Sequence, residues 1–241
     1  MELTALPTTT PVENCAWGTS YTLGELPRTT VRLVVVQPGE HLNPEIREMC
    51  AAHRVVVGGE AEVTVGNSTT RYAYGEHISV PEGSNYRIAC PAGDSALFII
   101  EVLVFAEMDI ARHGQQDSLL ATLPHEDRPW GAFYILANLP RTKVKLIVVQ
   151  PGEILSLQSH EQRAEHWVVA DGEAEVTVGE ALDKLQIQRH GHGKHVFIPR
   201  RAIHRMACPA GNTRLEIVEV QVGDGFDETD ITRYDDKYKR V

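Results

Sequence analysis

Val31-Arg-Leu-Val-Val-Val-Gln-Pro-Gly-Glu40 returns, with two conservative changes, as Val144-Lys-Leu-Ile-Val-Val-Gln-Pro-Gly-Glu153, an offset of 113 residues. The eight residues Gly59–Gly66 recur unchanged as Gly172–Gly179 at the same offset. Further along, an Ala-Cys-Pro-Ala-Gly block recurs at an offset of 118, so the second copy has gained five residues. Collinear matches of this length indicate a tandem duplication of a unit of about 110 residues, a normal domain size.

Each copy is predicted to be built from short β-strands. The runs at 31–36 and 144–149 are β-branched and end in Gln-Pro-Gly-Glu turns, and Glu60–Val65 alternates polar and apolar residues. Regular Gly and Pro punctuation favours an all-β barrel or sandwich. We expect a first domain at 1–114, a linker at 115–126 and a second domain at 127–241. Helix signals are weak, with short helices expected within 105–123 and 227–239.

Composition restricts the classes of partner. The chain of 241 residues has 23 Lys plus Arg and 33 Asp plus Glu, giving a formal charge of −10. That charge argues against nucleic acid or an anionic membrane as a partner. It still allows a small anionic substrate held by a few local cations. No secretory signal or long apolar span is visible, and the four cysteines form no CxxC pair. We therefore expect a cytoplasmic protein, and a homodimer is compatible with these features.

Four side chains of the second copy have the spacing of a metal site. Gln158 and His160 are two residues apart, so on a strand they point to the same side. Glu165 follows after a short turn, and His204 lies beyond Pro199. Imidazole, carboxylate and amide ligands converging inside a barrel suit a divalent metal with open water positions. The spacings match the two motifs of cupins, so we expect tandem cupin barrels of the double-stranded β-helix, or jelly-roll, type.

The first copy serves as an internal control. Its residues in place of the four expected ligands are Glu45, Arg47, Ala52 and Tyr86. The surrounding turns and strands are kept, so the ligand set is not needed to make the fold. The first copy is therefore predicted to be a metal-free cupin with a structural role.

The same comparison sorts the remaining polar candidates. Arg163 aligns with Cys50 and is therefore specific to the second copy, whereas Arg205 aligns with another arginine. His166 and His195 align with histidines, which favours packing or hydrogen bonding. Cys90 and Cys208 align with each other and are expected to be small buried residues. The histidine-rich tract at 189–195 is expected to be a solvated hairpin tip.

At these residues the second half resembles type II phosphomannose isomerases. The resemblance extends over about 127–240 and includes Arg128-Pro-Trp-Gly131, Arg163-Ala-Glu-His-Trp167 and Asp230-Ile-Thr-Arg233. It implies one divalent metal per chain, commonly zinc, at the four expected ligands, and a catalytic part for Arg163. The chain has no Gly-rich nucleotidyltransferase loop, so we expect no guanylyltransferase activity. Departures include Cys-Pro-Ala-Gly at 208–211, where the family usually has Asn-Pro-Gly.

The chemistry implied is interconversion of mannose 6-phosphate and fructose 6-phosphate through a cis-enediol. A metal and a neighbouring arginine can stabilise the charge that develops. Arg205 and His166 are further catalytic candidates, and the base is left open between a metal-bound hydroxide, Glu165 and His166. Cations that could hold the sugar phosphate are Lys143, Lys145, Arg200 and Arg201. The alternatives are another metal-dependent cupin enzyme, such as a dioxygenase or an epimerase-like enzyme, and a non-catalytic sugar-phosphate-binding protein.

Overall fold

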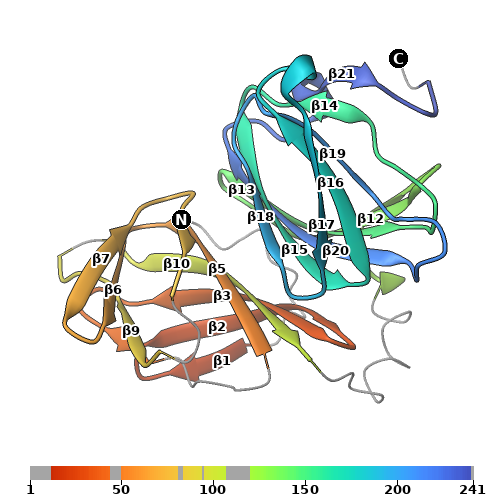
Figure 1. Cartoon of the computed structure of the whole chain (residues 1–241). Coiled ribbons are helices and arrows are strands. Elements are labelled where there is room, and N and C mark those ends of the chain that lie inside the picture. Colours follow the sequence, from red (N-terminus) through yellow and green to blue (C-terminus); the bar gives the residue numbers. More distant parts are fainter. Residues whose placement is uncertain (1–11, 44–49, 81–83, 94, 107–119, 240–241) are drawn as a thin grey trace. The chain divides into compact units, whose positions relative to one another are not determined.

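The structure is a computed structural model that describes residues 12–43, 50–80, 84–93, 95–106 and 120–239 (Figure 1). The chain divides into two compact units, Met1–Gln116 and Asp117–Val241. His125 and Glu126, which the sequence placed in the linker, lie in a strand of the second unit. Glu45 and Arg47 lie outside the described residues.

Two antiparallel sheets make up the described part of the first unit. Their strand orders are β1-β2-β3-β10-β5-β8 and β4-β9-β6-β7. The strands are β1 (Val12–Cys15), β2 (Gly18–Leu26), β3 (Thr29–Val36), β4 (His41–Leu42), β5 (Cys50–Gly58), β6 (Ala61–Val65), β7 (Ser68–Tyr72), β8 (His77–Ile78), β9 (Tyr86–Ala89) and β10 (Leu97–Phe105).

The second unit repeats this arrangement with one additional strand beside β14. Its sheets have the orders β11-β12-β13-β20-β15-β18 and β17-β16-β19-β14-β21. The strands are β11 (His125–Arg128), β12 (Gly131–Leu139), β13 (Thr142–Val149), β14 (Leu157–Ser159), β15 (Arg163–Asp171), β16 (Glu173–Gly179), β17 (Gln186–Gly191), β18 (His195–Ile198), β19 (Ile203–Ala207), β20 (Leu215–Gly223) and β21 (Thr232–Asp235). Two 3-10 turns complete it, η1 (Leu182–Lys184) and η2 (Glu228–Asp230).

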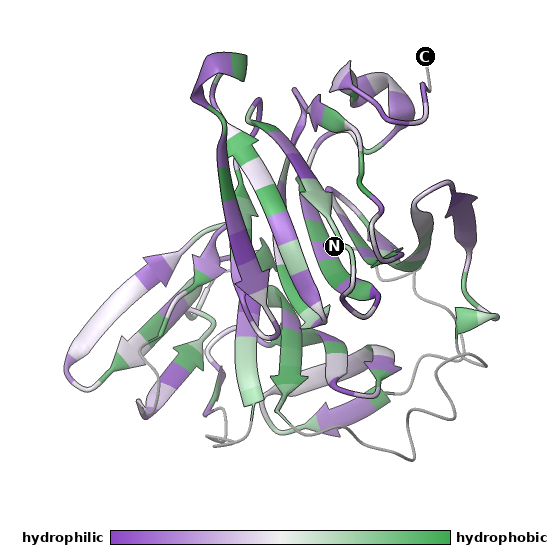
Figure 2. Cartoon of the chain, turned by 45° about the vertical axis from the view of Figure 1, so that its right-hand side comes forward, coloured by the Kyte–Doolittle hydropathy of each residue, from purple (hydrophilic) through white to green (hydrophobic). Residues whose placement is uncertain are grey.

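Strand pairing confirms the duplication in register. Glu101 of β10 lies opposite Arg32 of β3, and the equivalent Glu219 of β20 lies opposite Lys145 of β13. Figure 2 shows hydrophobic and hydrophilic bands alternating along strands of the second unit, as the two faces of a barrel wall require. The expected all-β fold of two tandem cupin barrels is confirmed.

The blocks kept in both copies meet one another in space. In the second unit the N–H of Gly152 donates to the carbonyl of Cys208 at 2.9 Å, and in the first unit Gly39 donates to Cys90 at 3.0 Å. Both glycines have a φ near +80°, which favours glycine. The two cysteines are buried and free of disulfides, so their expected role as small buried residues is confirmed. The Pro-Gly turn and the Cys-Pro-Ala-Gly block were therefore retained together because they close the same end of each barrel.

Apolar side chains between the two sheets form the core of each unit. In the second unit the core includes Trp130, Trp167 and Met206, and in the first it includes Val36, Ile88 and Ile99. Trp130 lies in the turn between β11 and β12, and the other five come from strands of both sheets. The polar site described below lies on the same inward strand faces, beyond the apolar core.

The C-terminal segment differs from expectation. The helix expected within 227–239 is replaced by the 3-10 turn η2 and strand β21. Asp227 accepts a hydrogen bond from the N–H of Thr229, and β21 then pairs with β14. The backbone hydrogen-bonding groups of this segment therefore find partners in a turn and at a sheet edge rather than in a helix. The first residue of the segment 105–123 ends strand β10, and most of that segment lies outside the described residues. In the described part of the chain, no helix is long and apolar enough to cross a membrane.

Candidate metal centre

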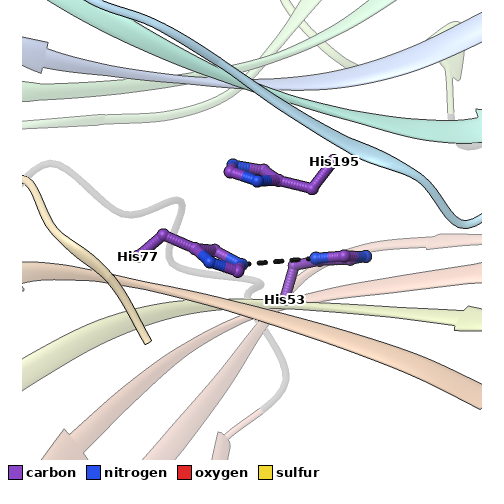
Figure 3. A group of neighbouring side chains, drawn as sticks. All are labelled: His53, His77 and His195. Atoms are coloured by element: carbon purple, nitrogen blue, oxygen red, sulfur yellow. Dashed lines mark hydrogen bonds between the residues drawn. The ribbon is translucent and has the colours of Figure 1, made fainter. Parts of the chain in front are cut away.

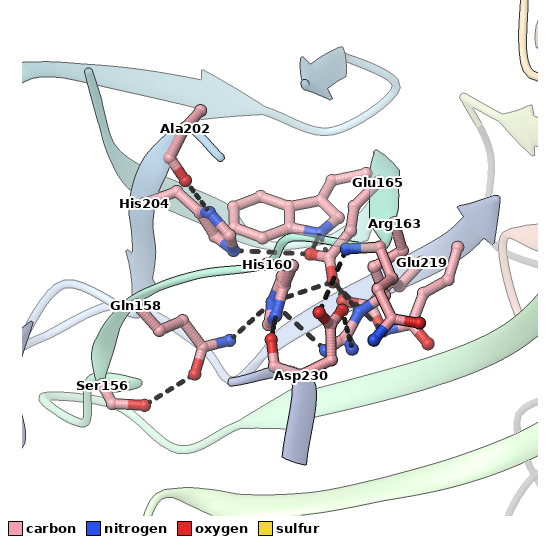
Figure 4. Close-up of polar contacts among 12 residues, drawn as sticks. Ser156, Gln158, His160, Arg163, Glu165, Ala202, His204, Glu219 and Asp230 are labelled. Carbon is pink, nitrogen blue, oxygen red and sulfur yellow. Dashed lines mark hydrogen bonds and ion pairs between the residues drawn. The ribbon is translucent and has the colours of Figure 1, made fainter. Parts of the chain in front are cut away.

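His160, Glu165 and His204 converge inside the second barrel (Figure 4). His160 stands in the turn after β14, Glu165 points inward from β15, and His204 points inward from β19. Their ligand atoms all lie within 4.8 Å of one another, and each residue is no more than 2% exposed. Three of the four residues predicted as ligands thus come together in one buried cluster.

Backbone carbonyls orient both imidazoles. Nδ1 of His160 lies 3.1 Å from the carbonyl of Asp230, and Nδ1 of His204 lies 2.8 Å from the carbonyl of Ala202. Since a carbonyl can only accept, each Nδ1 carries the proton and each Nε2 turns a lone pair toward Glu165. The distances from Glu165 to Nε2 of His160 and of His204 are 3.3 and 3.6 Å.

His204 carries the observation that tests whether a metal fits. Its Nε2 atom is buried and has no hydrogen-bond partner in the described structure. A buried acceptor without a partner costs free energy, about 1–3 kcal/mol, unless something else occupies that position. A metal ion bound by the lone pair would satisfy it, so the residues present fit a divalent metal.

Gln158, the fourth predicted ligand, lies at the edge of this cluster. Its amide nitrogen is 3.3 Å from Nε2 of His160, and its oxygen accepts from the Ser156 hydroxyl at 2.8 Å. A half turn of the amide would exchange the two ends, and the serine hydroxyl can donate or accept. The position therefore allows the amide oxygen to face the cluster.

Protonation states also suit a metal. Burial lowers the pKa of His160 to about 4 and also lowers the pKa of His204, so both rings are neutral near pH 7. Burial by itself would raise the pKa of Glu165, but the charges that His160 and His204 gain on protonation at low pH, together with that of Arg163, hold it well below its usual range. Two neutral imidazoles and one carboxylate are the ligand states that a divalent metal requires.

Arg163 lies against this cluster from the start of β15. Its Nε donates to Glu165 at 3.1 Å and its Nη1 donates to Asp230 at 3.2 Å. Its Nη2 lies 3.2 Å from Nε2 of His160. The guanidinium is 3% exposed, so the structure places a permanent, desolvated positive charge beside the ligands.

A second polar group lines the inward face of β20. Gln221 donates to Glu165 at 3.1 Å, and Nε1 of Trp167 lies between Glu165 and Glu219, at 3.1 and 3.2 Å. Burial, followed by the neighbouring Glu165, raises the pKa of Glu219 to about 7, against the opposing charge of Lys145. One oxygen each of Glu219 and Gln221 is buried without a hydrogen-bond partner.

The two predicted lysines approach the same interior from β13. Nζ of Lys145 lies 3.5 Å from Glu219 and 4.9 Å from the ring centroid of Phe133. Nζ of Lys143 lies 5.7 Å from the ring centroid of Phe226. Burial lowers the pKa of Lys143, and the nearby positive charges of Lys145 and Arg163 lower it further. Lys143 and Lys145 are two residues apart, so they share one face of the strand.

Other predicted residues lie away from the cluster. Arg205 neighbours His204 on β19, so it points to the opposite face, where it pairs with Asp235 at 2.8 Å. Arg200 and Arg201 are largely exposed and pair with Asp224 and Glu161.

His166 neighbours Glu165 on β15 and faces the other way, with Nδ1 3.0 Å from Nε2 of His195. The equivalent pair in the first unit, His53 and His77, is joined in the same way at 3.3 Å (Figure 3). The histidine-rich tract, at 189–195, lies along β17 and the turn into β18.

Comparison with known proteins gives the family. The model of the family described as "Mannose-6-phosphate isomerase C-terminal" matches residues 12–115 and again residues 115–236. The chain belongs to this family. Each of its two units corresponds to one match, so the first unit is a member although it lacks the ligand set.

Curated relatives match about half of the chain. Over 114 residues, 47% of this chain, it is 44% identical to the xanthan biosynthesis protein XanB of Xanthomonas campestris pv. campestris. It is 40% identical to the mannose-1-phosphate guanylyltransferase ManC of Salmonella typhimurium over 114 residues. It is 42% identical to the alginate biosynthesis protein AlgA of Pseudomonas aeruginosa over the same length. The matched part spans only 22–23% of these relatives.

Solved structures resemble the chain in fold. Oxalate decarboxylase of Lactobacillus farciminis, in a formate complex, aligns with a TM-score of 0.42 and 14% identity over 94% of this chain and 86% of its own. A cupin 2 conserved barrel domain protein from Leptotrichia buccalis aligns with a TM-score of 0.36 and 16% identity, covering 84% and 88% of the two chains.

In the first unit of this family member, an arginine occupies the space where the second unit gathers its ligands. Arg54, equivalent to Trp167, donates to Glu101 at 2.8 Å and forms an ion pair with it at 2.7 Å. It also donates to the hydroxyl of Tyr86, the residue equivalent to His204. Sequence comparison predicted the loss of metal ligands in the first unit. The structure adds that Arg54 neutralises Glu101, a carboxylate that the second copy retains as Glu219.

Three polar residues of the second site were missed by sequence reasoning. Glu219 and Gln221 alternate with apolar residues along β20, and that period of two on an otherwise apolar strand is a signal that could have found them. Asp230 belongs to a block that carries the family resemblance, but the pattern indicated no role at the site because its segment was expected to be helical.

Proposed function

We propose that the second unit is a zinc-dependent aldose–ketose isomerase that interconverts mannose 6-phosphate and fructose 6-phosphate. The observation that carries the proposal is the unpartnered, buried Nε2 of His204 facing Glu165 and His160 beside the buried charge of Arg163. Membership of the family supports the substrate, and the chain's small share of its relatives' length makes this a proposal for the cupin part alone.

The proposed metal ligands are His160, Glu165, His204 and, after rotation of its amide, Gln158. A divalent metal bound there would act as a Lewis acid on the substrate oxygens and lower the pKa of the C–H proton that moves between C2 and C1. Zinc is proposed because two neutral imidazoles and a carboxylate are ligands it commonly takes.

Arg163 is proposed to stabilise the negative charge that grows on the oxygens of the substrate. Its Nη2 atom lies 3.2 Å from Nε2 of His160, so the guanidinium is already beside the place where that charge would develop. Asp230 and Glu165 hold it from two sides, which limits the reorganisation it needs during the reaction.

Lys143 is proposed to bind the phosphate, with Lys145 beside it. Arg200 and Arg201 are less suited because their ion partners are close and both side chains are largely exposed. The Gln221 oxygen, buried without a hydrogen-bond partner, is an acceptor that a sugar hydroxyl would satisfy, and Glu219, 3.5 Å from Nζ of Lys145, offers a carboxyl group beside it. The interior thus offers cations for one end of a sugar phosphate and acceptors for its hydroxyl groups.

The test combines metal analysis with a coupled assay on the purified whole chain supplied with mannose 6-phosphate. We expect one zinc per chain and turnover that chelation removes and zinc restores. His204→Ala should lose metal and turnover together, whereas Tyr86→Ala, the matched change in the first unit, should keep both. Metal without turnover would reject the isomerase and favour a binding protein, and oxygen consumption would favour a dioxygenase.

A further inference from the structure

Asp230 makes four contacts with the candidate centre although it lies outside the two cupin motifs. It ends the turn η2, 67 to 70 residues after the groups it touches, and is 6% exposed. The backbone carbonyl and both carboxylate oxygens take part, each with a different partner (Figure 4).

One set of contacts fixes the turn that carries His160. Oδ1 of Asp230 accepts from the backbone N–H groups of Glu161 and Gln162, each at 3.0 Å. The carbonyl of Asp230 accepts from Nδ1 of His160 at 3.1 Å. The first pair holds the backbone just after the candidate ligand, and the second selects the imidazole tautomer whose unprotonated Nε2 faces Glu165.

The other carboxylate oxygen acts on the catalytic candidate Arg163. Oδ2 accepts from Nη1 at 3.2 Å, while Nε of the same guanidinium donates to Glu165. Two carboxylates on different edges fix the plane of a guanidinium, because its donors have a rigid fork geometry. Without Asp230, the guanidinium would keep its contacts with Glu165 and with Nε2 of His160 but would lose the carboxylate that holds its Nη1 edge.

Local contacts anchor η2 itself. Asp227 caps it by accepting from the N–H of Thr229 at 3.0 Å. Glu228 forms ion pairs with Arg128 of β11 at 3.1 Å and with Arg233 of β21 at 2.7 Å. The turn is therefore held to two strands, which allows Asp230 to impose its geometry on the site rather than follow it.

We propose that Asp230 is a positioning residue that fixes both a metal ligand, His160, and the guanidinium of Arg163. The effect on Arg163 rests on the proposed isomerase function, whereas the effect on metal affinity does not. The two effects use different oxygens of one carboxylate, so they can be separated by substitution.

Asp230→Asn separates them because the amide oxygen can still accept from the two turn N–H groups. The amide nitrogen would then face Nη1 of Arg163, donor against donor. We expect a zinc affinity close to wild type, a kcat lowered by about 10²-fold through misplacement of the guanidinium, and an unchanged KM. Asp230→Ala removes both carboxylate oxygens and keeps only the backbone carbonyl that contacts His160, so the turn after the ligand loses its anchor and zinc affinity should also fall, by about 10 to 100-fold.

The experiment measures zinc affinity by competition with a chromophoric chelator and the visible spectrum of the cobalt-substituted protein, alongside kinetics. Asp235→Asn, an exposed change in the neighbouring strand β21, is the matched control and should alter none of these. Wild-type zinc affinity and an unchanged cobalt spectrum in Asp230→Ala would overturn the role of the carboxylate in fixing the turn that carries His160. Wild-type kcat in Asp230→Asn would overturn the role toward Arg163.

Three further observations keep the outcomes distinct. If the wild-type chain bound zinc without isomerase turnover, the proposed function would fail while the zinc affinities would still decide the role of Asp230 toward His160. Circular dichroism should show native strand content in Asp230→Asn, so this variant keeps the proposal testable even if Asp230→Ala does not fold. Equal losses of kcat in both variants, with equal losses of zinc affinity, would contradict the separation into two oxygens.

Discussion

Replacing Arg54 by Met tests whether an internal cation holds the first unit together. The guanidinium meets one oxygen of Glu101 through Nε at 2.8 Å and Nη2 at 2.7 Å. The two side chains are only 8% and 11% exposed. Met keeps most of the length and apolar volume of the arginine stem but removes the charge, which leaves a buried carboxylate without its cation.

The expected magnitude follows from that burial. Removing one partner of a buried ion pair costs about 3–5 kcal/mol, because the remaining charge is desolvated and uncompensated. Replacing both partners, as in Arg54→Met with Glu101→Leu, removes the charge as well and should cost much less. With an m value of about 1–3 kcal/mol/M in urea, a loss of 3 kcal/mol lowers the unfolding midpoint by about 1–3 M.

The assay is urea unfolding of the whole chain, followed by circular dichroism and by the fluorescence of Trp17, the tryptophan of the first unit. Arg71→Met is the control within the same unit. Arg71 pairs with Glu60 and Glu62 but its side chain is 65% exposed, so its loss should cost less than about 1 kcal/mol. A cost for Arg54→Met no larger than for Arg71→Met, or no recovery in the double variant, would refute the internal cation.

Three further predictions concern the metal and the reaction. Purified protein should contain one divalent ion per chain, and His160→Ala or His204→Ala should each abolish it in elemental analysis; two ions per chain would contradict this. Arg163→Ala should lower kcat by about 10²-fold or more with metal content unchanged, and Arg163→Lys should restore only part of it, since the planar fork is lost; full turnover in the Ala variant would reject the role. Ligands rebuilt in the first unit should bind zinc weakly and gain no isomerase activity. Adding Arg54→Trp should strengthen zinc binding, because the competing cation is gone. Equal zinc affinity with and without Arg54→Trp, measured by calorimetry, would contradict this competition. The rebuilt unit carries Glu45→Gln, Arg47→His, Ala52→Glu and Tyr86→His.

The cluster of candidate metal ligands could be predicted because the chain contains its own comparison. His160, Glu165 and His204 stand where a second copy of the same scaffold has other residues, so their chemistry separates from the needs of the fold. Strand alternation would also have shown that Arg205, next to His204, points to the other face of β19. The alignment of Arg205 with Arg87 of the first copy had left its role open.

Asp230 and Arg54 illustrate what sequence could not show. Asp230 reaches the site across 67 to 70 residues, through a segment whose pattern indicated a helix. Arg54 lies in the first copy, which the sequence comparison characterised only by its missing metal ligands. The fold shows that the Arg54 side chain contacts Glu101 and Tyr86. Contacts of this kind depend on which strands become neighbours, and local propensity has no information about that.

The separation of His160 from Asp230 along the chain also sets an order of events during synthesis. At about 5–20 residues per second, the 70 residues between them take about 4–14 s to translate. Throughout that interval the nascent second barrel has its histidine but not the carbonyl that orients it, so a metal ion arriving early meets an unfinished site. In the first barrel the internal positive charge is Arg54 of β5. Folding of this barrel therefore requires neither a metal ion nor a segment that is translated later. Capture of the proposed metal ion in its final geometry would therefore follow the docking of η2 and β21 rather than precede it.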